Sequence, residues 1–184
     1  MRTSAAVVIV AIVALYCMLP AAGGSEGGGA PKRDESRLGT LDKAAELELT
    51  KNPAAVVSPA AKAGELTVYG VKLGDAADKI PNTAAVSAQS VPERPQDVVH
   101  MGRDVSYYAF QGKIYRIRIQ GDLANQIPTY DADRLQVALG KADDILRSAS
   151  GEDTRLSFIA RHLRFTVHSF RMLSVIAEVD LYAP

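Results

Sequence analysis

Histidine and cysteine are the residue types in this chain best suited to nucleophilic or metal chemistry, and there are 3 histidines and 1 cysteine. His162 and His168 lie six apart in an alternating run. At a strand rise of about 3.3 Å per residue they would be about 20 Å apart, too far to share a metal ion. His100 has no obvious partner in a proline-rich stretch. Cys17 stands alone, which excludes an internal disulfide and a cysteine-based metal site.

Other catalytic signatures are equally scarce. No Gly-x-Ser-x-Gly motif is present, and the glycines at 27–29 lack the Gly-Lys-Ser/Thr that completes a phosphate loop. The pairs Asp75/Asp78 and Asp143/Asp144 are explained by helix capping or solvation. We therefore predict a protein that is not an enzyme, with no catalytic residue, no metal site and no cofactor.

Arginine and aromatic residues suggest a different kind of site, a contact for a partner protein or an anionic envelope polymer. Both residue types are enriched in binding hot spots. The candidate contact residues, which alternation would place on the outward face of a sheet, are Tyr108, Arg116, Arg118, Arg155, Arg161, His162 and Arg164. The competing interpretation is an ordinary solvated sheet face whose charge is balanced by Glu178 and Asp180.

The strongest structural pattern is the run from 156 to 181. Apolar residues alternate with polar ones over two stretches, which is typical of strands with one buried face and one solvated face. The predicted buried residues are Leu163, Phe165, Val167, Leu173, Val175, Ala177, Val179 and Leu181. A polar connection at 168–172 makes the two stretches an antiparallel hairpin.

A second hairpin is predicted at 105–119, with its turn at Gln111–Gly112. Helices are expected at 41–52, 73–80 and 131–147, a short strand at 65–71, and a proline-rich loop at 91–104. The segment 73–80 aligns weakly with 139–146, and each is followed by a hairpin. We therefore predict an α+β domain of two α-β-β units, with one antiparallel sheet and helices on one of its faces.

Part of this pattern resembles the small envelope lipoproteins of the SmpA/BamE and beta-lactamase-inhibitor-protein-like group. The residues that carry the resemblance, within 66–181, are Leu73, Gly74, Asp78, Gly112, Ile114, Ile117, Ile119, Leu139, Gly140 and Asp144. The acylated cysteine of that group has no convincing counterpart here. The resemblance implies non-catalytic protein–protein contact in the cell envelope.

The N-terminus carries an uncharged apolar stretch from Ala5 to Ala22, preceded by Arg2. A membrane anchor needs about 20 apolar residues, with a range of ~17 to 25, so the stretch just qualifies. The candidate anchor residues are Ala5, Val8, Ile12, Leu15 and Leu19. Two alternatives stay open. The stretch is a cleaved signal peptide that releases a soluble periplasmic protein, or Cys17 is lipidated. In each case the folded part lies outside the bacterial inner membrane.

The chain therefore divides into a hydrophobic segment at 1–22, a Gly/Ala/Pro-rich linker at 23–63 and a folded domain at 64–184. The balance of 21 basic and 21 acidic residues argues against a nucleic-acid partner. We predict a membrane-tethered interaction or assembly protein of the cell envelope that uses the sheet face or the segment 91–104. The alternative is an accessory subunit of a larger integral membrane complex, in which the alanine-rich helix packs among others.

Overall fold

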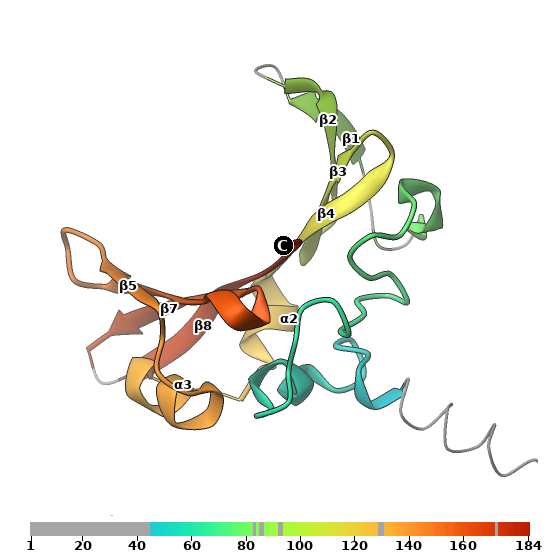
Figure 1. Ribbon diagram of the computed structural model, residues 1–184. Coiled ribbons are helices and arrows are strands. Elements are labelled where there is room, and N and C mark those ends of the chain that lie inside the picture. Colours follow the sequence, from blue (N-terminus) through green and yellow to red (C-terminus); the bar gives the residue numbers. More distant parts are fainter. Residues whose placement is uncertain (1–44, 83, 85–86, 92–93, 129–130, 172) are drawn as a thin grey trace, which may run out of the picture. The chain divides into compact units, whose positions relative to one another are not determined.

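The computed structural model describes residues 45–82, 84, 87–91, 94–128, 131–171 and 173–184. They form one antiparallel sheet of eight strands in the order β1-β2-β3-β4-β8-β7-β6-β5 (Figure 1). The strands are β1 (Ser87–Val91), β2 (Arg94–Met101), β3 (Val105–Phe110), β4 (Lys113–Gln120), β5 (Asp144–Arg147), β6 (Asp153–Phe158), β7 (Leu163–Phe170) and β8 (Leu173–Tyr182). The order shows two consecutive meanders, β1 to β4 and β5 to β8, joined where β4 pairs with β8.

The predicted α+β class is wrong, because the described residues are nearly all-β. Apart from the helical residues Ala45 and Glu46, their helices are α2 (Gly121–Asn125) and α3 (Ala132–Leu139), with short 3-10 turns η1 (Pro53–Val57), η2 (Ala77–Lys79) and η3 (Ile159–Arg161). The helix predicted over 131–147 ends at Gly140, whose φ of 94° is not helical, and its second half is strand β5, paired with β6. The segment 73–80 forms the short turn η2 and an isolated bridge from Ala76 to Lys113 in place of the predicted helix.

Two further elements also differ from the prediction. The segment 91–104, which was expected to be a loop, contains strand β2. Pro95 does not prevent this strand, because the pairing of β2 with β3 begins at Asp97 and leaves Pro95 outside that ladder. Proline lacks an N–H and is tolerated at such a position. Of the helix predicted at 41–52, Ala45 and Glu46 are helical, whereas residues 47–52 form turns and an isolated bridge between Glu48 and Thr67.

Both predicted hairpins are confirmed as hairpins. β3 and β4 turn at Gln111 and Gly112, both at positive φ, and β7 pairs with β8 along its whole length. For β8, the prediction that Leu173, Val175 and Ala177 face the core is wrong. A bulge between Thr166 and Val167 shifts the register, so that Val167 pairs with Ile176. Ile176 is buried, whereas Leu173 is 75% exposed. A bulge shifts which side chains of a strand face the core.

The core lies on one face of the sheet, between the inward side chains of the strands and the covering segments. Tyr107, Ile117, Phe165 and Val179 are fully buried there. The helices α2 and α3 and the segment before β1 lie on this side of the sheet (Figure 1). The same core contains Leu49, Val56, Val57, Ala61 and Ala63, so the folded unit takes in residues that the sequence analysis placed in the linker.

A buried carboxylate holds this covering segment together. Glu48 accepts hydrogen bonds from Tyr69 N (2.9 Å), Gly70 N (2.8 Å) and the Thr50 hydroxyl (2.6 Å). Burial alone would raise the pKa of Glu48, but these hydrogen bonds outweigh it and lower the pKa. Tyr107 of β3 donates its hydroxyl to Val68 O at 2.9 Å and so ties the segment to the sheet.

Within the described ranges, no helix is long and apolar enough to cross a membrane. The predicted anchor at Ala5–Ala22, with Ala5, Val8, Ile12, Leu15 and Leu19, lies outside the described residues.

Candidate functional site: the polar face of the sheet

The face of the sheet opposite the core carries alternate polar side chains of β3, β4, β8, β7 and β6. We call it the polar face. Since α2, α3 and the segment 45–80 pack on the other side, none of these elements covers it (Figure 1). The register places Arg118 opposite Asp180, and Asp180 opposite Arg164, so charged residues of three neighbouring strands lie in one row.

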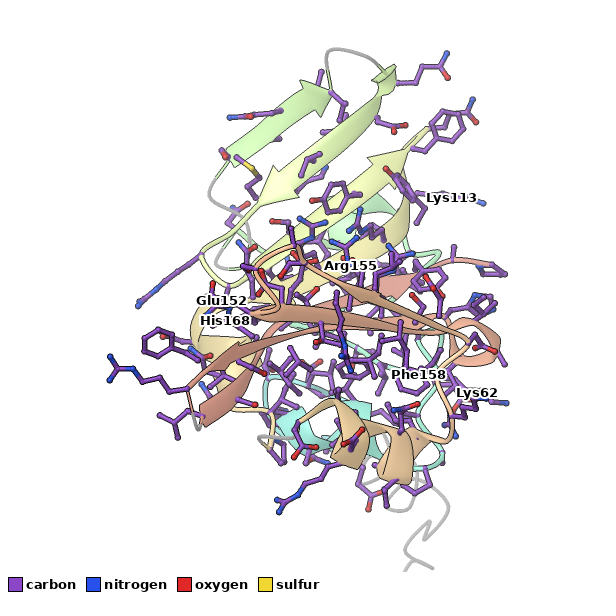
Figure 2. The ribbon with its side chains drawn as sticks, turned by 90° about the vertical axis from the view of Figure 1, so that its left-hand side faces the viewer. Lys62, Lys113, Glu152, Arg155, Phe158 and His168 are labelled. Carbon is purple, nitrogen blue, oxygen red and sulfur yellow. The ribbon has the colours of Figure 1, made fainter. Side chains whose placement is uncertain are left out.

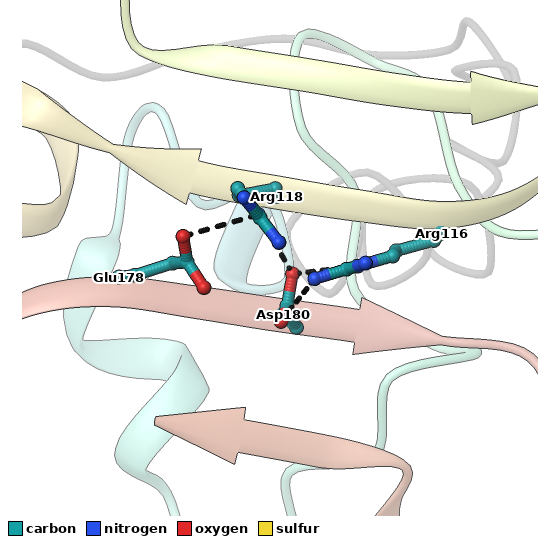
Figure 3. Close-up of polar contacts among 4 residues, drawn as sticks. All are labelled: Arg116, Arg118, Glu178 and Asp180. Atoms are coloured by element: carbon teal, nitrogen blue, oxygen red, sulfur yellow. Dashed lines mark hydrogen bonds and ion pairs between the residues drawn. The ribbon is translucent and has the colours of Figure 1, made fainter. Parts of the chain in front are cut away.

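Asp180 is the centre of this row, and it is only 2% exposed. Arg116 binds it with two hydrogen bonds, Nε to Oδ1 at 2.8 Å and Nη2 to Oδ2 at 2.6 Å. Arg118 adds a bond from Nε to Oδ1 at 3.3 Å and an ion pair with Glu178 at 3.1 Å (Figure 3). A buried carboxylate requires such partners, because an uncompensated buried charge is strongly unfavourable.

The pKa values of this network follow from burial and from charge. For Arg116, burial favours the neutral form, but the hydrogen bonds to Asp180 outweigh it and raise the pKa. For Glu178, burial raises the pKa, and the negative charge of Asp180 adds to the effect, while Arg118, Arg116 and Arg155 oppose it. Asp180 is therefore the carboxylate on which the two arginines converge, and Glu178 is the weaker partner.

Aromatic stacking fixes the same two arginines in place. The guanidinium carbons of Arg116 and Arg118 lie 4.9 Å and 5.7 Å from the ring centroid of Tyr108. Such cation–π contacts contribute about 0.5–1 kcal/mol at exposed sites. A bulge between Tyr108 and Ala109 brings Tyr115 onto the same side, with the two tyrosine ring centroids 6.3 Å apart. Arg116, Arg118 and Tyr108 thus form one cluster with Asp180 and Glu178, whose carboxylates neutralise the two arginines.

Arg155 and Arg164 lie on the same face but differ in their partners. Neither side chain has a hydrogen bond or an ion pair among the described residues. Arg164 stacks on Tyr182, with its guanidinium carbon 5.5 Å from the ring centroid, and its buried Nε has no hydrogen-bond partner. Arg155 is exposed on β6 (Figure 2). Two guanidinium groups of the polar face are therefore available to an acceptor from outside the described chain.

The structure brings together most, but not all, of the predicted contact residues. Arg116, Arg118, Arg155, Arg164 and Tyr108 share the polar face. Arg161 lies in η3 and donates instead to the backbone oxygens of residues 59 and 61, at 2.5 Å and 3.0 Å.

His162, another predicted contact residue, does not lie in a strand. It precedes β7 in the left-handed region, at φ 55°, and packs edge-on against Tyr182 with ring centroids 5.6 Å apart. Sequence reasoning missed Tyr182 as a member of this face. Its position two residues after Asp180 in an alternating strand was the available signal.

The other histidine of the predicted strand makes a pair with a carboxylate. His168 Nδ1 lies 2.8 Å from Asp153 Oδ1, across the β6–β7 ladder. Among the described residues, no hydroxyl hydrogen-bonds to its Nε2, and no cluster of three or more His, Cys, Asp or Glu side chains could hold a metal ion. The arrangement of the polar face suits recognition of carboxylates or other anions by arginine forks.

No family model, curated protein or solved structure matches the chain. The fold itself defines the class of the described residues: an antiparallel, nearly all-β domain whose sheet has one covered and one uncovered face.

Proposed function

We propose that the protein is a non-catalytic, membrane-tethered interaction or assembly protein of the bacterial cell envelope. Its folded domain lies outside the inner membrane, and the polar face of the sheet is the contact for a partner protein. The apolar stretch Ala5–Ala22 and the likeness to small envelope lipoproteins support the location.

One observation carries the choice of contact surface. Arg155 and Arg164 have no ion pair in the described part of the chain, although Asp180 and Glu178 on the same face are already engaged by Arg116 and Arg118. Arginine and tyrosine are enriched among the residues that contribute most to binding at protein interfaces, and Arg164 is already held against Tyr182, so it loses little conformational entropy on binding.

Site-specific photo-crosslinking in the native cells tests this proposal. A photoreactive residue replaces Thr166, which lies between Arg155 and Glu178 on the polar face. The matched control replaces Val137, which is 87% exposed on α3 and lies on the covered side. We expect a discrete, light-dependent protein adduct from position 166 and none from position 137.

Charge reversal makes the test specific. The double variant R155E/R164E should lose the adduct at position 166, whereas Arg134→Glu on α3 should keep it. Equal adducts at both positions, or an adduct at 166 that survives the double reversal, would contradict the proposal. Arg116 and Arg118 are unsuitable for this purpose, because reversing them leaves Asp180 buried without a counter-ion and so disturbs the sheet itself.

A further inference from the structure

An apolar cluster lies at the end of the sheet where β7 turns into β8. Phe170 is 54% exposed, Leu173 is 75% exposed, and Val175 is exposed as well. The register pairs Phe170 with Leu173 and His168 with Val175, which places these side chains in two successive rows on the face opposite the core. Single exposed apolar residues are common, whereas a contiguous group requires an explanation. We call Phe170, Leu173 and Val175 the tip cluster.

The register shift between Thr166 and Val167 turns this part of β8 outward. Ile176 takes the core position, so Leu173 and Val175 lie on the solvated face although their alternation in the sequence is typical of a buried row. The described chain therefore does not cover these side chains, and either water or an external surface does.

The polar groups beside the tip cluster match the boundary of a lipid bilayer. His168 Nδ1 lies 2.8 Å from Asp153 Oδ1, and this pair is one row behind Phe170 and Leu173. At about 3.3 Å per residue, the outer row projects about 7 Å past the pair. Interfacial helices bury their apolar face to a depth of ~5–10 Å, so insertion of the outer row alone keeps the histidine–aspartate pair at the polar boundary.

Arg171 places a positive charge where lipid phosphates lie. It is exposed, its guanidinium carbon is 5.1 Å from the ring centroid of Phe170, and it makes no ion pair among the residues that the structure describes. An arginine stem can follow an inserted ring while its charged head stays in the polar layer. Glu152 is the opposing charge at this end of the sheet (Figure 2). Its backbone oxygen accepts from Ser169 N at 2.7 Å, so its backbone also lies behind the outer row.

A second copy of the chain fits the tip cluster less well than a bilayer does. Stable protein interfaces bury about 800 Å² on each partner. A large aromatic side chain buries at most about 250 Å². Three side chains that are only partly exposed, two of them smaller than phenylalanine, therefore fall short of this area.

The anchor proposed at Ala5–Ala22 lowers the area that a bilayer contact needs. The segment 23–44 joins this stretch to the first described residue, Ala45. A chain of this length spans at most about 75 Å, which is about twice the diameter of a folded unit of this size. Either end of the sheet can therefore reach the bilayer. Tethering makes the contact intramolecular, so that a small apolar surface is enough to favour it.

We propose that the tip cluster is a second membrane contact, with Phe170 and Leu173 inserted at the boundary between headgroups and acyl chains and Arg171 at the phosphates. The contact turns this end of the sheet toward the bilayer and so orients the polar face. The inference rests on the proposed function, because the membrane anchor supplies the proximity on which a small contact depends.

A tryptophan reporter tests the inference, since the chain has no tryptophan of its own. The full chain carrying Leu173→Trp is reconstituted into vesicles of phosphatidylcholine and phosphatidylglycerol, with bromine atoms in the acyl chains as quenchers. We expect the emission to shift to shorter wavelength and to lose most of its intensity in brominated vesicles. Val137→Trp, at the 87% exposed position on α3, is the matched control and should lose little.

A second pair of variants ties the quenching to the cluster. Phe170→Ser in the Leu173→Trp chain should reduce the quenching strongly. Ile159→Ser in the same chain should not change it, because Ile159 is an exposed apolar residue of η3, at the opposite end of β7. Equal quenching at positions 173 and 137, or quenching that Phe170→Ser leaves unchanged, would overturn the inference. A blue shift at position 173 that depends on protein concentration and not on bromine would show that a second copy covers the cluster, which also overturns it.

Flotation of the chain with the vesicles is measured first and separates the two proposals. A chain that does not float lacks the anchor, which contradicts the proposed function and the inference together. If the chain floats and position 166 gives its charge-dependent adduct, but position 173 is not quenched, the inference fails and the proposed function stands. Quenching at position 173 without that adduct would keep the membrane contact and remove the polar face as the partner site.

Discussion

Two pairs of arginines on one sheet face have opposite roles. Arg116 and Arg118 on β4 converge on Asp180, which is 2% exposed, and stack on Tyr108. Arg155 on β6 and Arg164 on β7 have neither an ion pair nor a hydrogen bond in the described chain. The same residue type in the same alternating pattern is therefore a structural counter-ion in one meander and an open donor in the other.

The partners of an arginine on this face, and not its residue type, decide whether it is structural or a candidate contact residue. Removal of an arginine that neutralises a buried carboxylate leaves that charge uncompensated and destabilises the fold. An arginine without an acceptor can be removed at little cost to the fold. Mutational tests of binding on this face are therefore informative only in the second meander.

Replacement of Asp180 by alanine should cause the largest loss of stability among the variants of this face. The variant leaves Arg116 and Arg118 side by side without their shared carboxylate, and breaking a buried pair in this way costs about 3–5 kcal/mol. Thermal unfolding of the full chain in mild detergent, followed by circular dichroism, measures the loss.

Asp122→Ala is the matched control, because its ion pair with Arg103 at 2.8 Å is largely exposed. Exposed pairs contribute about 0–1 kcal/mol, so this variant should unfold close to the unmodified chain. A loss at Asp180 no larger than at Asp122 would mean that the first arginine pair is not structural.

The sequence predicted one part of this arrangement and missed another. Alternation along 115–119 and 163–167 correctly placed Arg116, Arg118 and Arg164 away from the core. Successive side chains of a strand point to opposite faces of the sheet, so once the apolar residues face the core the residues between them must face the other way. The pairing of Arg116 with Asp180 joins residues 64 apart and depends on β4 meeting β8. No local pattern specifies that neighbourhood.

The errors in the fold have local physical causes. The helical pattern predicted over 131–147 is interrupted at Gly140, where the chain leaves the helix, and Asp144–Arg147 becomes the edge strand β5. β1 was missed because Ser87–Val91 is an exposed edge without alternation. A bulge in the pairing of β7 with β8 places Ile176 in the core instead of Val175 and Ala177. The sequence of neither strand by itself indicates this bulge.

Glu178 lies between the two arginine pairs, and its titration depends on how strongly each pair acts on it. Its pKa in the folded chain is raised above 4.5 by burial and by Asp180. The stabilisation that its protonation gives is fully present below pH 4.5 and is lost as the pH rises through the raised value. Glu178→Gln cannot ionise. The stability of this variant relative to the unmodified chain should therefore increase from about pH 4 to about pH 7, by less than about 1 kcal/mol for a partly exposed group.

Paired thermal denaturation across this pH range measures the effect, and the difference between the two proteins cancels the other carboxylates. The opposite slope, with the unmodified chain gaining on the variant as the pH rises, would mean that the neighbouring arginines, Arg118 at 3.1 Å first among them, outweigh burial and the charge of Asp180.

The smallest expected effect concerns the unpaired arginines themselves. The double variant R155Q/R164Q loses the stacking of Arg164 on Tyr182 but leaves no carboxylate unpaired, so its stability should fall by less than about 1 kcal/mol. Arg116→Gln, measured in parallel by thermal unfolding, should cost more because Asp180 keeps only the longer 3.3 Å bond from Arg118. A small stability change together with loss of the position-166 adduct would separate binding from folding on this face. If R155Q/R164Q loses as much stability as Arg116→Gln, all four arginines are structural. The proposal that the polar face is the contact surface would then be contradicted.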